Sequence, residues 1–434
     1  MLFTRKVARR SGRIGVIGCS LAAFGAVLAA SGGARLEERS SVVLEADAGP
    51  FHLFAIPEPA RLAWHWKGRV LVAERLRAGR AALQTRSPAG WSSIGPLRRA
   101  AAVEGRVAFE APASEGGLVR VEAAAVRRDS REILRVEVEA RGAIAIRDDW
   151  IPGPEEQVYV ARGRPAWVFS SKGYAVTVEG AGESTPRVEQ PDPDTLRLEA
   201  TGERLTYEVL PGSVREVLAE HLRTAISRRE ARAAGDPAGA ATLVPVRTWT
   251  DLDPGLAWIL EAFLSSGEPA ALEMEALAED AALRERVEVA AAFLPWFERR
   301  RPEARSARSR AIADAVRRAA GGRLETFAAD GLPLFRPLFA EHPEPKPAWT
   351  SRGEWLLGPD LLVAPVTEKG VRERRLWIPP GEWVDLCAEP AAADLEYGPS
   401  RKVAGAGRDG IVVYARRSAA SAFADLGAAL RSQE

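Results

Sequence analysis

Two pairs of acidic residues are the groups in this chain whose type and spacing could do chemistry. Asp251 and Asp253 lie just before Pro254 and an apolar stretch, and Glu273 and Glu275 alternate with apolar residues. Two carboxyl groups that face one pocket can act as acid and base. Each pair also fits a structural role, because Asp before a helix caps free N–H groups and alternating acids line the wet face of a strand.

Other reactive residue types are sparse in the 434 residues of the chain. It has two cysteines, Cys19 and Cys387, and four scattered histidines: His52, His65, His221 and His342. No Cys/His cluster has the spacing of metal ligands, so we expect neither a metal nor another cofactor. The formal net charge is only +1, which indicates no nucleic-acid or anionic-membrane partner.

The first 34 residues have the pattern of an export signal. Basic residues between Arg5 and Arg13 precede an apolar run from Ile14 to Ala30, and small residues at 32–34 offer a cleavage site. An uncleaved anchor and a lipoprotein modified at Cys19 are the alternatives. The segment predicts an exported protein of the periplasm or cell envelope, with membrane contact only through this stretch. The sequence indicates no oligomeric state.

Hydrophobic periodicity divides the rest of the chain into three regions. Residues 35–213 alternate apolar and polar positions between turn residues, which predicts a β-sandwich. After Ser213, a plausible helix N-cap, residues 214–350 follow mainly the helical period. Residues 351–434 return to short β patterns broken by Pro and Gly, which predicts a smaller C-terminal β-sandwich. The expected fold class is therefore mixed α and β.

The most specific motifs lie near the C-terminal end. They are Gly-Leu-Pro-Leu-Phe-Arg-Pro-Leu-Phe at 331–339, Leu-Leu-Gly-Pro-Asp-Leu-Leu-Val-Ala-Pro-Val at 356–366, and Leu-Trp-Ile-Pro-Pro-Gly-Glu-Trp at 376–383. In this order they resemble the end of the catalytic barrel and the start of the next β-domain in glycoside hydrolase family 31, the α-glucosidase and α-xylosidase family. Within the first motif, Arg336 fits a structural ion-pair partner better than a ligand.

The resemblance implies a galactose-mutarotase-like N-terminal β-sandwich followed by a (β/α)8 barrel. Between Arg228 and Val244, however, this chain has about fifteen residues where the family carries several barrel strands and helices. A complete barrel needs about 200–250 residues. Residues 214–350 are therefore expected to be a mainly helical remnant of the barrel between the two β-domains.

The resemblance also implies which residues could retain a role in sugar chemistry. Retaining glycosidases use two carboxyl groups, one as nucleophile and one as acid/base. The family's nucleophile motif has no match here, and its acid/base motif is matched only in part by Trp249, with either Asp251 or Asp253 in the acid position. The candidate substrate-binding residues are Trp249, Arg247, Glu273, Glu275 and Trp296. Core packing is the competing interpretation for the two tryptophans.

Three hypotheses about function remain open. The first is a family 31 homologue that has lost catalysis and binds carbohydrate or plays a structural part in the envelope. The second is an active α-glycosidase with a rebuilt site that uses Asp251 or Asp253 as acid/base. The third is an exported β-rich scaffold protein with no relation to sugar, because a shared fold does not fix function.

Overall fold

The computed structural model describes most of the chain after residue 42. The described residues are 43–75, 80–103, 106–113, 116–128, 131–163, 165–179, 186–233, 242–266, 270–273, 280–294, 306–321, 324, 327–389, 395–406 and 410–432. The predicted signal or anchor at 1–34, with Cys19, lies outside them. In the described part of the chain, no helix is both long and apolar enough to cross a bilayer.

The chain forms two compact units. One consists of Met1–Val160 and Arg164–Gly212, and the other of Ala161–Gly163 and Ser213–Glu434. The break at Gly212 coincides with the change in periodicity at Ser213.

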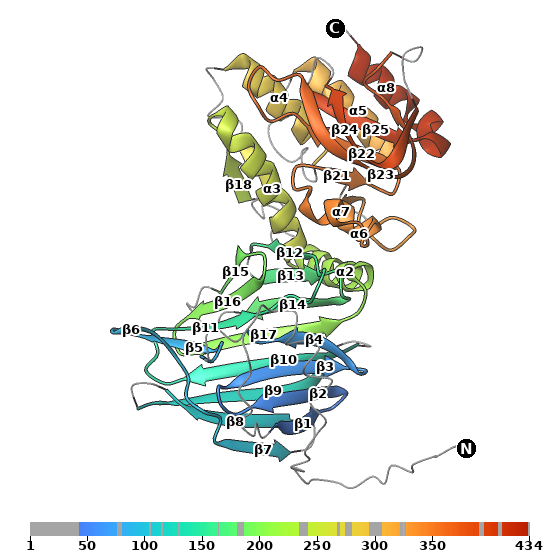
Figure 1. Ribbon diagram of the computed structural model, residues 1–434. Helices are drawn as coiled ribbons and strands as arrows, with labels where there is room; N and C mark the ends of the chain where they lie inside the picture. Colours follow the sequence, from blue (N-terminus) through green and yellow to red (C-terminus); the bar gives the residue numbers. More distant parts are fainter. Residues whose placement is uncertain are drawn as a thin grey trace, which may run out of the picture. The chain divides into compact units, whose positions relative to one another are not determined.

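Sheets make up the first unit (Figure 1). Their strand orders are β1-β2-β3-β4, β12-β13-β14-β17-β10-β9-β8-β7 and β15-β16-β11-β5-β6. The bounds are β1 (Leu44–Ala48), β2 (Phe51–Ile56), β3 (Arg61–Trp66), β4 (Arg69–Ala73), β5 (Gln84–Ser87), β6 (Gly90–Ser93), β7 (Arg99–Val103), β8 (Arg106–Pro112), β9 (Leu118–Arg128), β10 (Arg131–Ala140), β11 (Ala145–Trp150), β12 (Val158–Ala161), β13 (Ala166–Ser170), β14 (Tyr174–Glu179), β15 (Pro186–Asp192), β16 (Thr195–Thr201) and β17 (Arg204–Pro211).

One hydrophobic core joins the three sheets of this unit. It includes Leu53 of β2, Val136 of β10 and Leu198 of β16, one residue from each sheet. Alternate side chains of a strand point to opposite faces, so an apolar residue at every second position covers one face. This alternation explains why the strands of the first unit can be located from the sequence.

The second unit begins with α2 (Val214–Ala233), whose start is fixed by a capping box. The Glu216 amide donates to Ser213 Oγ (3.3 Å), and the Ser213 amide donates to Glu216 Oε2 (2.9 Å). These bonds satisfy two N–H groups that a helix start leaves free. The Ser213 N-cap predicted from the sequence is thereby confirmed.

The second unit combines helices with two sheets. Strands β18 and β19 form a two-stranded parallel sheet, and six strands form an antiparallel sheet in the order β20-β21-β22-β25-β23-β24. The bounds are β18 (Thr242–Pro245), α3 (Trp249–Ser266), β19 (Ala270–Glu273), α4 (Ala281–Ala291), α5 (Ala307–Ala320), β20 (Phe335–Pro337), α6 (Leu338–Glu341), α7 (Lys346–Thr350), β21 (Trp355–Leu357), β22 (Leu361–Pro365), β23 (Glu373–Asp385), β24 (Leu395–Gly405), β25 (Ile411–Arg416), the 3-10 helix η3 (Arg417–Phe423) and α8 (Ala424–Arg431).

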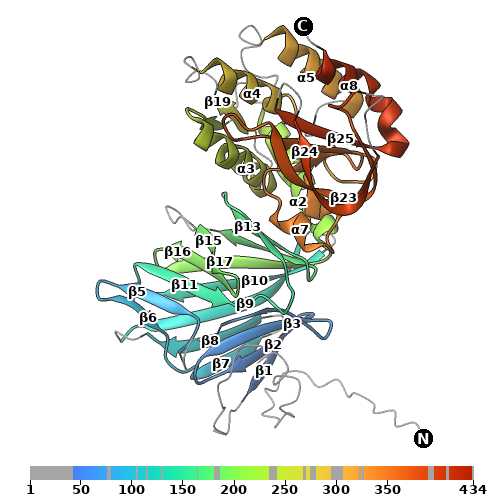
Figure 2. The same ribbon diagram turned by 45° about the horizontal axis from the view of Figure 1, so that its top comes forward.

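Helix α8 packs along α5 in this unit (Figure 2). Arg308 of α5 donates through Nη2 to the carbonyl oxygen of Leu430 (3.1 Å). The C-terminal helix is therefore held to the domain by packing and by a cation at its last turn, where the helix dipole favours positive charge.

Two elements differ from the sequence expectation. The apolar pattern of 256–264 predicts a helix there, whereas α3 already begins at Trp249. The helix tolerates Pro254 because this residue removes only one backbone donor near the helix start and its fixed φ is already helical. The apolar patterns at 375–378 and 383–386 predict two strands, but both lie in one strand, β23, with a register shift between Ile378 and Gly381.

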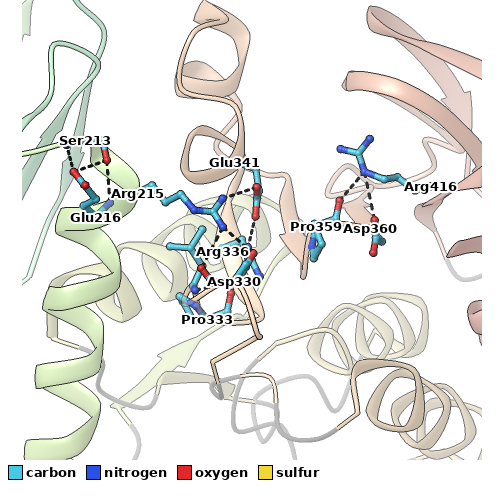
Figure 3. A network of polar contacts seen from close by, with 11 residues as sticks. Ser213, Arg215, Glu216, Asp330, Pro333, Arg336, Glu341, Pro359, Asp360 and Arg416 are labelled. Carbon is cyan, nitrogen blue, oxygen red and sulfur yellow. Dashed lines mark hydrogen bonds and ion pairs between the residues drawn. The ribbon is translucent and has the colours of Figure 1, made fainter. Parts of the chain in front are cut away.

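A network of charged side chains anchors the segment that carries the first C-terminal motif (Figure 3). The Arg336 side chain is fully buried, and it contacts Asp330 (2.6 Å), Glu341 and the carbonyl oxygen of Pro333 (2.7 Å). Arg215 of α2 pairs with the same two carboxylates, at 3.1 Å from Asp330 and 3.0 Å from Glu341. The predicted ion-pair role of Arg336 is confirmed.

We expect Arg336→Met to destabilise the second unit by about 3 kcal/mol, because removing one partner of a buried pair leaves the others uncompensated. Arg215→Met is the matched control. Its side chain is 40% exposed, so the expected loss is below about 1 kcal/mol. Urea unfolding followed by tryptophan fluorescence measures both, and equal losses would contradict the assignment of Arg336 as the central residue.

Candidate functional site

Asp251 lies at the start of α3, where its carboxylate serves the helix itself. Oδ2 accepts hydrogen bonds from the amides of Thr248 (2.8 Å) and Arg247 (3.0 Å) and from Thr248 Oγ1 (2.9 Å). These hydrogen bonds hold the pKa of Asp251 below its ordinary value. A general acid needs a raised pKa, so the geometry favours capping over acid catalysis.

Asp253 is more open, with 55% of its side chain exposed. Its Oδ1 accepts from Thr367 Oγ1 (3.3 Å) and lies 3.8 Å from Nη1 of Arg374. Arg374 in turn donates to the carbonyl oxygen of Gly353 (3.2 Å). Asp253 thus faces the loop before β21 and the start of β23, and its charge is balanced by a guanidinium.

Trp249 takes part in a polar cluster at the start of α4. Its Nε1 donates to Asp280 Oδ2 (3.0 Å), and the guanidinium of Arg286 lies 5.5 Å from the centre of its ring. The Leu283 amide, Trp249 and Lys369 all donate to Asp280 and lower its pKa to about 2. Trp249 is therefore fixed by its neighbours in a way that suits a structural role.

The other sequence candidates are only partly described. Arg247 is exposed, and its amide serves the cap of Asp251. Glu273 is the last residue of β19, and only its backbone is described, while Glu275 and Trp296 lie outside the described residues. The structure thus brings Asp251, Trp249 and Arg247 together at one helix start, and the roles of Glu273, Glu275 and Trp296 stay predictions.

Glu261 is a buried carboxylate on α3 that sequence reasoning missed. Its Oε1 lies 3.4 Å from Nη1 of Arg352, and its Oε2 accepts from the amide of Arg162 (3.4 Å). Burial raises its pKa, and the charges of Arg162 and Arg352 oppose this shift. The signal in the sequence is a single acid inside the apolar run 256–264.

Asp253 and Glu261 are not spaced like a glycosidase pair along the helix. They are eight residues apart on α3, which corresponds to about 12 Å between their backbone positions. Carboxyl groups in retaining enzymes are about 5–5.5 Å apart and in inverting enzymes about 6.5–9.5 Å. The backbone spacing is wider than either separation, and each acid lies near a guanidinium group of its own, Arg352 for Glu261 and Arg374 for Asp253.

Glu354 is a second buried carboxylate that the sequence did not point to. Its Oε2 accepts from the amide of Trp377 (3.2 Å), and burial raises its pKa to about 7. The nearby charges of Arg374 and Arg401 lower that pKa in part. Glu354 links the start of β21 to β23, within the segment that carries the C-terminal motifs.

Residues 331–419 match the family model of the glycosyl hydrolase family 31 C-terminal domain. This part of the chain is therefore assigned to glycoside hydrolase family 31. The match begins at Gly331, beside the Arg336 network, and ends in η3. The family resemblance inferred from the motifs is therefore confirmed, as is a mixed fold, mostly of sheets, with a β-sandwich at the C-terminal end.

Curated relatives match over short stretches. A 1,3-α-isomaltosidase of Kribbella flavida is 41% identical over 61 residues, 14% of this chain and 8% of that protein. A sulfoquinovosidase of Escherichia coli is 42% identical over 57 residues, 13% of this chain and 8% of that protein. Because the matches span only 8% of these relatives, their activities do not transfer directly.

A solved structure extends the likeness of fold. A family 31 sulfoquinovosidase from E. rectale, in complex with an aza-sugar inhibitor, superimposes with a TM-score of 0.51 at 11% identity, covering 88% of this chain and 99% of that chain. At this identity the similarity shows a shared fold and no more.

We predict that Glu354→Gln changes how stability depends on pH. Burial raises the folded-state pKa of Glu354 to about 7. The stability that the protonated side chain contributes to the folded state is therefore fully present below about pH 4 and is lost as the pH rises toward 7. At pH 8 the free energy of unfolding of the variant should exceed that of the parent protein by up to about 3 kcal/mol. At pH 4 the two values should be equal.

Urea unfolding at pH 4, 6 and 8 measures this difference. Glu382→Gln on the same strand, β23, is the control, because Glu382 is 48% exposed and should show no such trend. An equal pH dependence in Glu354→Gln and the parent protein would show that Glu354 is ionised in the folded state.

Proposed function

We propose that this chain is a family 31 homologue that does not hydrolyse glycosidic bonds and that binds carbohydrate. One observation carries the proposal: the Asp251 carboxylate accepts three hydrogen bonds from Arg247 and Thr248 at the start of its own helix. The lowered pKa of Asp251 and the separation of Asp253 from Glu261 support it. The sequence adds that the family's nucleophile motif has no match.

The proposal includes a division into an N-terminal sandwich at 35–213, a barrel remnant at 214–350 and a C-terminal sandwich at 351–434. The parallel pair of β18 and β19, with α3 between them in sequence, is the strand–helix–strand arrangement from which such barrels are built. Between Ser213 and Asp330, the described residues contain these two strands, whereas a closed barrel needs eight.

Trp258 is the residue we propose as a carbohydrate contact. It lies on α3 with 36% of its surface exposed, about one turn before Glu261. An indole offers an apolar face for a sugar ring, and the ion pair of Glu261 with Arg352 places polar groups on the neighbouring turn of the helix. The relatives named above act on sugars, which supports a sugar ligand by analogy.

An active enzyme with a rebuilt site is the second candidate. The observation in its favour is that Asp253 is open to solvent and shares a helix face with Glu261, whose raised pKa suits a proton donor. A place in the cell envelope is part of the first proposal and rests on the basic and apolar N-terminal stretch of the sequence.

We expect the purified protein to release no product from aryl α-glucosides or α-xylosides above the level of Asp251→Asn and Asp253→Asn. Both variants remove a carboxylate that an acid/base mechanism would need. Turnover that either substitution abolishes would refute the proposal and establish the second candidate.

Trp258→Ala should weaken binding to any glycan that the parent protein retains on an array, by about tenfold, because the sugar loses its apolar platform. Isothermal titration with that glycan measures the loss. Trp66→Ala, which changes a partly buried tryptophan of the first unit, is the control and should bind as the parent does. An array without any bound glycan would favour a scaffold role.

A further inference from the structure

Two sheets of the first unit meet where β4 runs beside β11. Glu74 forms an isolated antiparallel bridge with Trp150. The Arg75 amide donates to the carbonyl oxygen of Asp149 (2.6 Å), and the Ile151 amide donates to that of Ala73 (2.9 Å). The four-stranded sheet is thus tied to the five-stranded sheet through a short backbone junction.

Two carboxyl groups are buried at this junction. Glu74 is 4% exposed and Asp148 is 1% exposed. Asp148 lies two residues from Trp150, the bridge partner of Glu74, so both acids are on the same face of the junction, and Asp148 Oδ1 is buried without a donor. The Leu62 amide donates to Glu74 Oε2 (2.7 Å), and Trp150 Nε1 donates to Asp148 Oδ2 (2.8 Å). An ionised carboxyl group can only accept hydrogen bonds, so a hydrogen bond between these two neighbouring acids would require that one of them keeps its proton.

The charges around the pair agree with one shared proton. Arg61 of β3 faces Glu74 and donates through Nε to its backbone oxygen (2.8 Å). The nearest other acid, Asp149, is neutralised by Arg197 at 2.8 and 3.1 Å. One buried cation, Arg61, therefore interacts with the charge of Glu74, and Arg61, Glu74 and Asp148 together are electrically neutral only when the two acids carry a single negative charge.

No other charged partner comes from the remaining element packed here, β17, as far as the described contacts show. It contributes Tyr207, whose fully buried hydroxyl has a raised pKa through burial and through the nearby Asp148 and Glu74. Tyr207 therefore stays neutral and cannot balance a second negative charge.

We propose that Glu74 and Asp148 share one proton in the folded protein and form a pH-sensitive latch between the sheet of β1–β4 and strand β11. Loss of the shared proton would leave two like charges in contact in a site with little water. The junction between β4 and β11 is then expected to open before the rest of the first unit.

The direction of the pH effect follows from burial. Burial raises the pKa of Glu74 well above its ordinary value and that of Asp148 to about 7. In the unfolded chain both groups lose their protons near pH 4. The latch is therefore fully closed below pH 4. The stability that the protonated pair contributes to the first unit is lost as the pH rises toward and past 7.

The test compares the full-length protein with Asp148→Asn and with Glu74→Gln. For the parent, linkage to one proton predicts that the unfolding constant of the first unit rises up to about tenfold per pH unit between pH 5 and 7. Asp148→Asn keeps an oxygen acceptor for Trp150. It should remove this pH dependence, because unfolding of the variant should release about one proton fewer than unfolding of the parent. Glu122→Gln on β9, an acid at the surface, is the control and should keep the parental slope.

Hydrogen exchange read by mass spectrometry localises the effect. After correction for the intrinsic rate, amides of 61–75 and 145–151 should open more at pH 8 than at pH 5.5 in the parent, and this difference should shrink in Asp148→Asn. Infrared difference spectra of the parent at pH 6 should show a protonated carboxyl band that Asp148→Asn or Glu74→Gln alters. An unchanged slope in both variants, or no protonated carboxyl in the parent, would overturn the proposal.

Discussion

The second unit depends on the burial of one guanidinium group. Arg336 has no solvent exposure, so its charge must be met by protein groups, and Asp330, Glu341 and the carbonyl oxygen of Pro333 meet it. These partners come from a short segment, 330–341, that forms the entry to the C-terminal sheet. Arg215 adds a second cation from α2 and thereby connects the first helix of the unit to the same segment.

The same physical constraint, a charged group removed from water, explains where the unusual acids of this protein lie. Glu74, Asp148 and Glu354 are buried, and each accepts a hydrogen bond from a backbone amide or an indole. Their raised pKa values would suit proton transfer, yet none of them belongs to the motif that resembles the family's acid/base site. Asp251 lies in that motif, and its pKa moves in the opposite direction. A shifted pKa of an acid therefore reflects its burial in the fold here as much as any role in chemistry.

Much of the fold could be predicted from the sequence, and the candidate site far less. The strands of the first unit follow a period of two, and the N-cap at Ser213 with Glu216 three residues later is a local signal. The start of α3 was misplaced because Pro254 suggested a boundary that the helix does not have. Glu261 was missed because an acid in an apolar run gives no hint of Arg352, which is far away in the chain.

The sequence by itself determined the family of the C-terminal part, through ordered motifs between 331 and 383, and the succession of β-rich and helical regions. Both are properties of residues near one another in the chain, so local patterns suffice to reveal them. Only the tertiary structure decided which carboxyl groups are buried, paired or free. The pKa of an acid depends on the donors and charges within a few ångströms, and for Glu74 and Glu354 these include Asp148 and Arg401, which are distant in sequence.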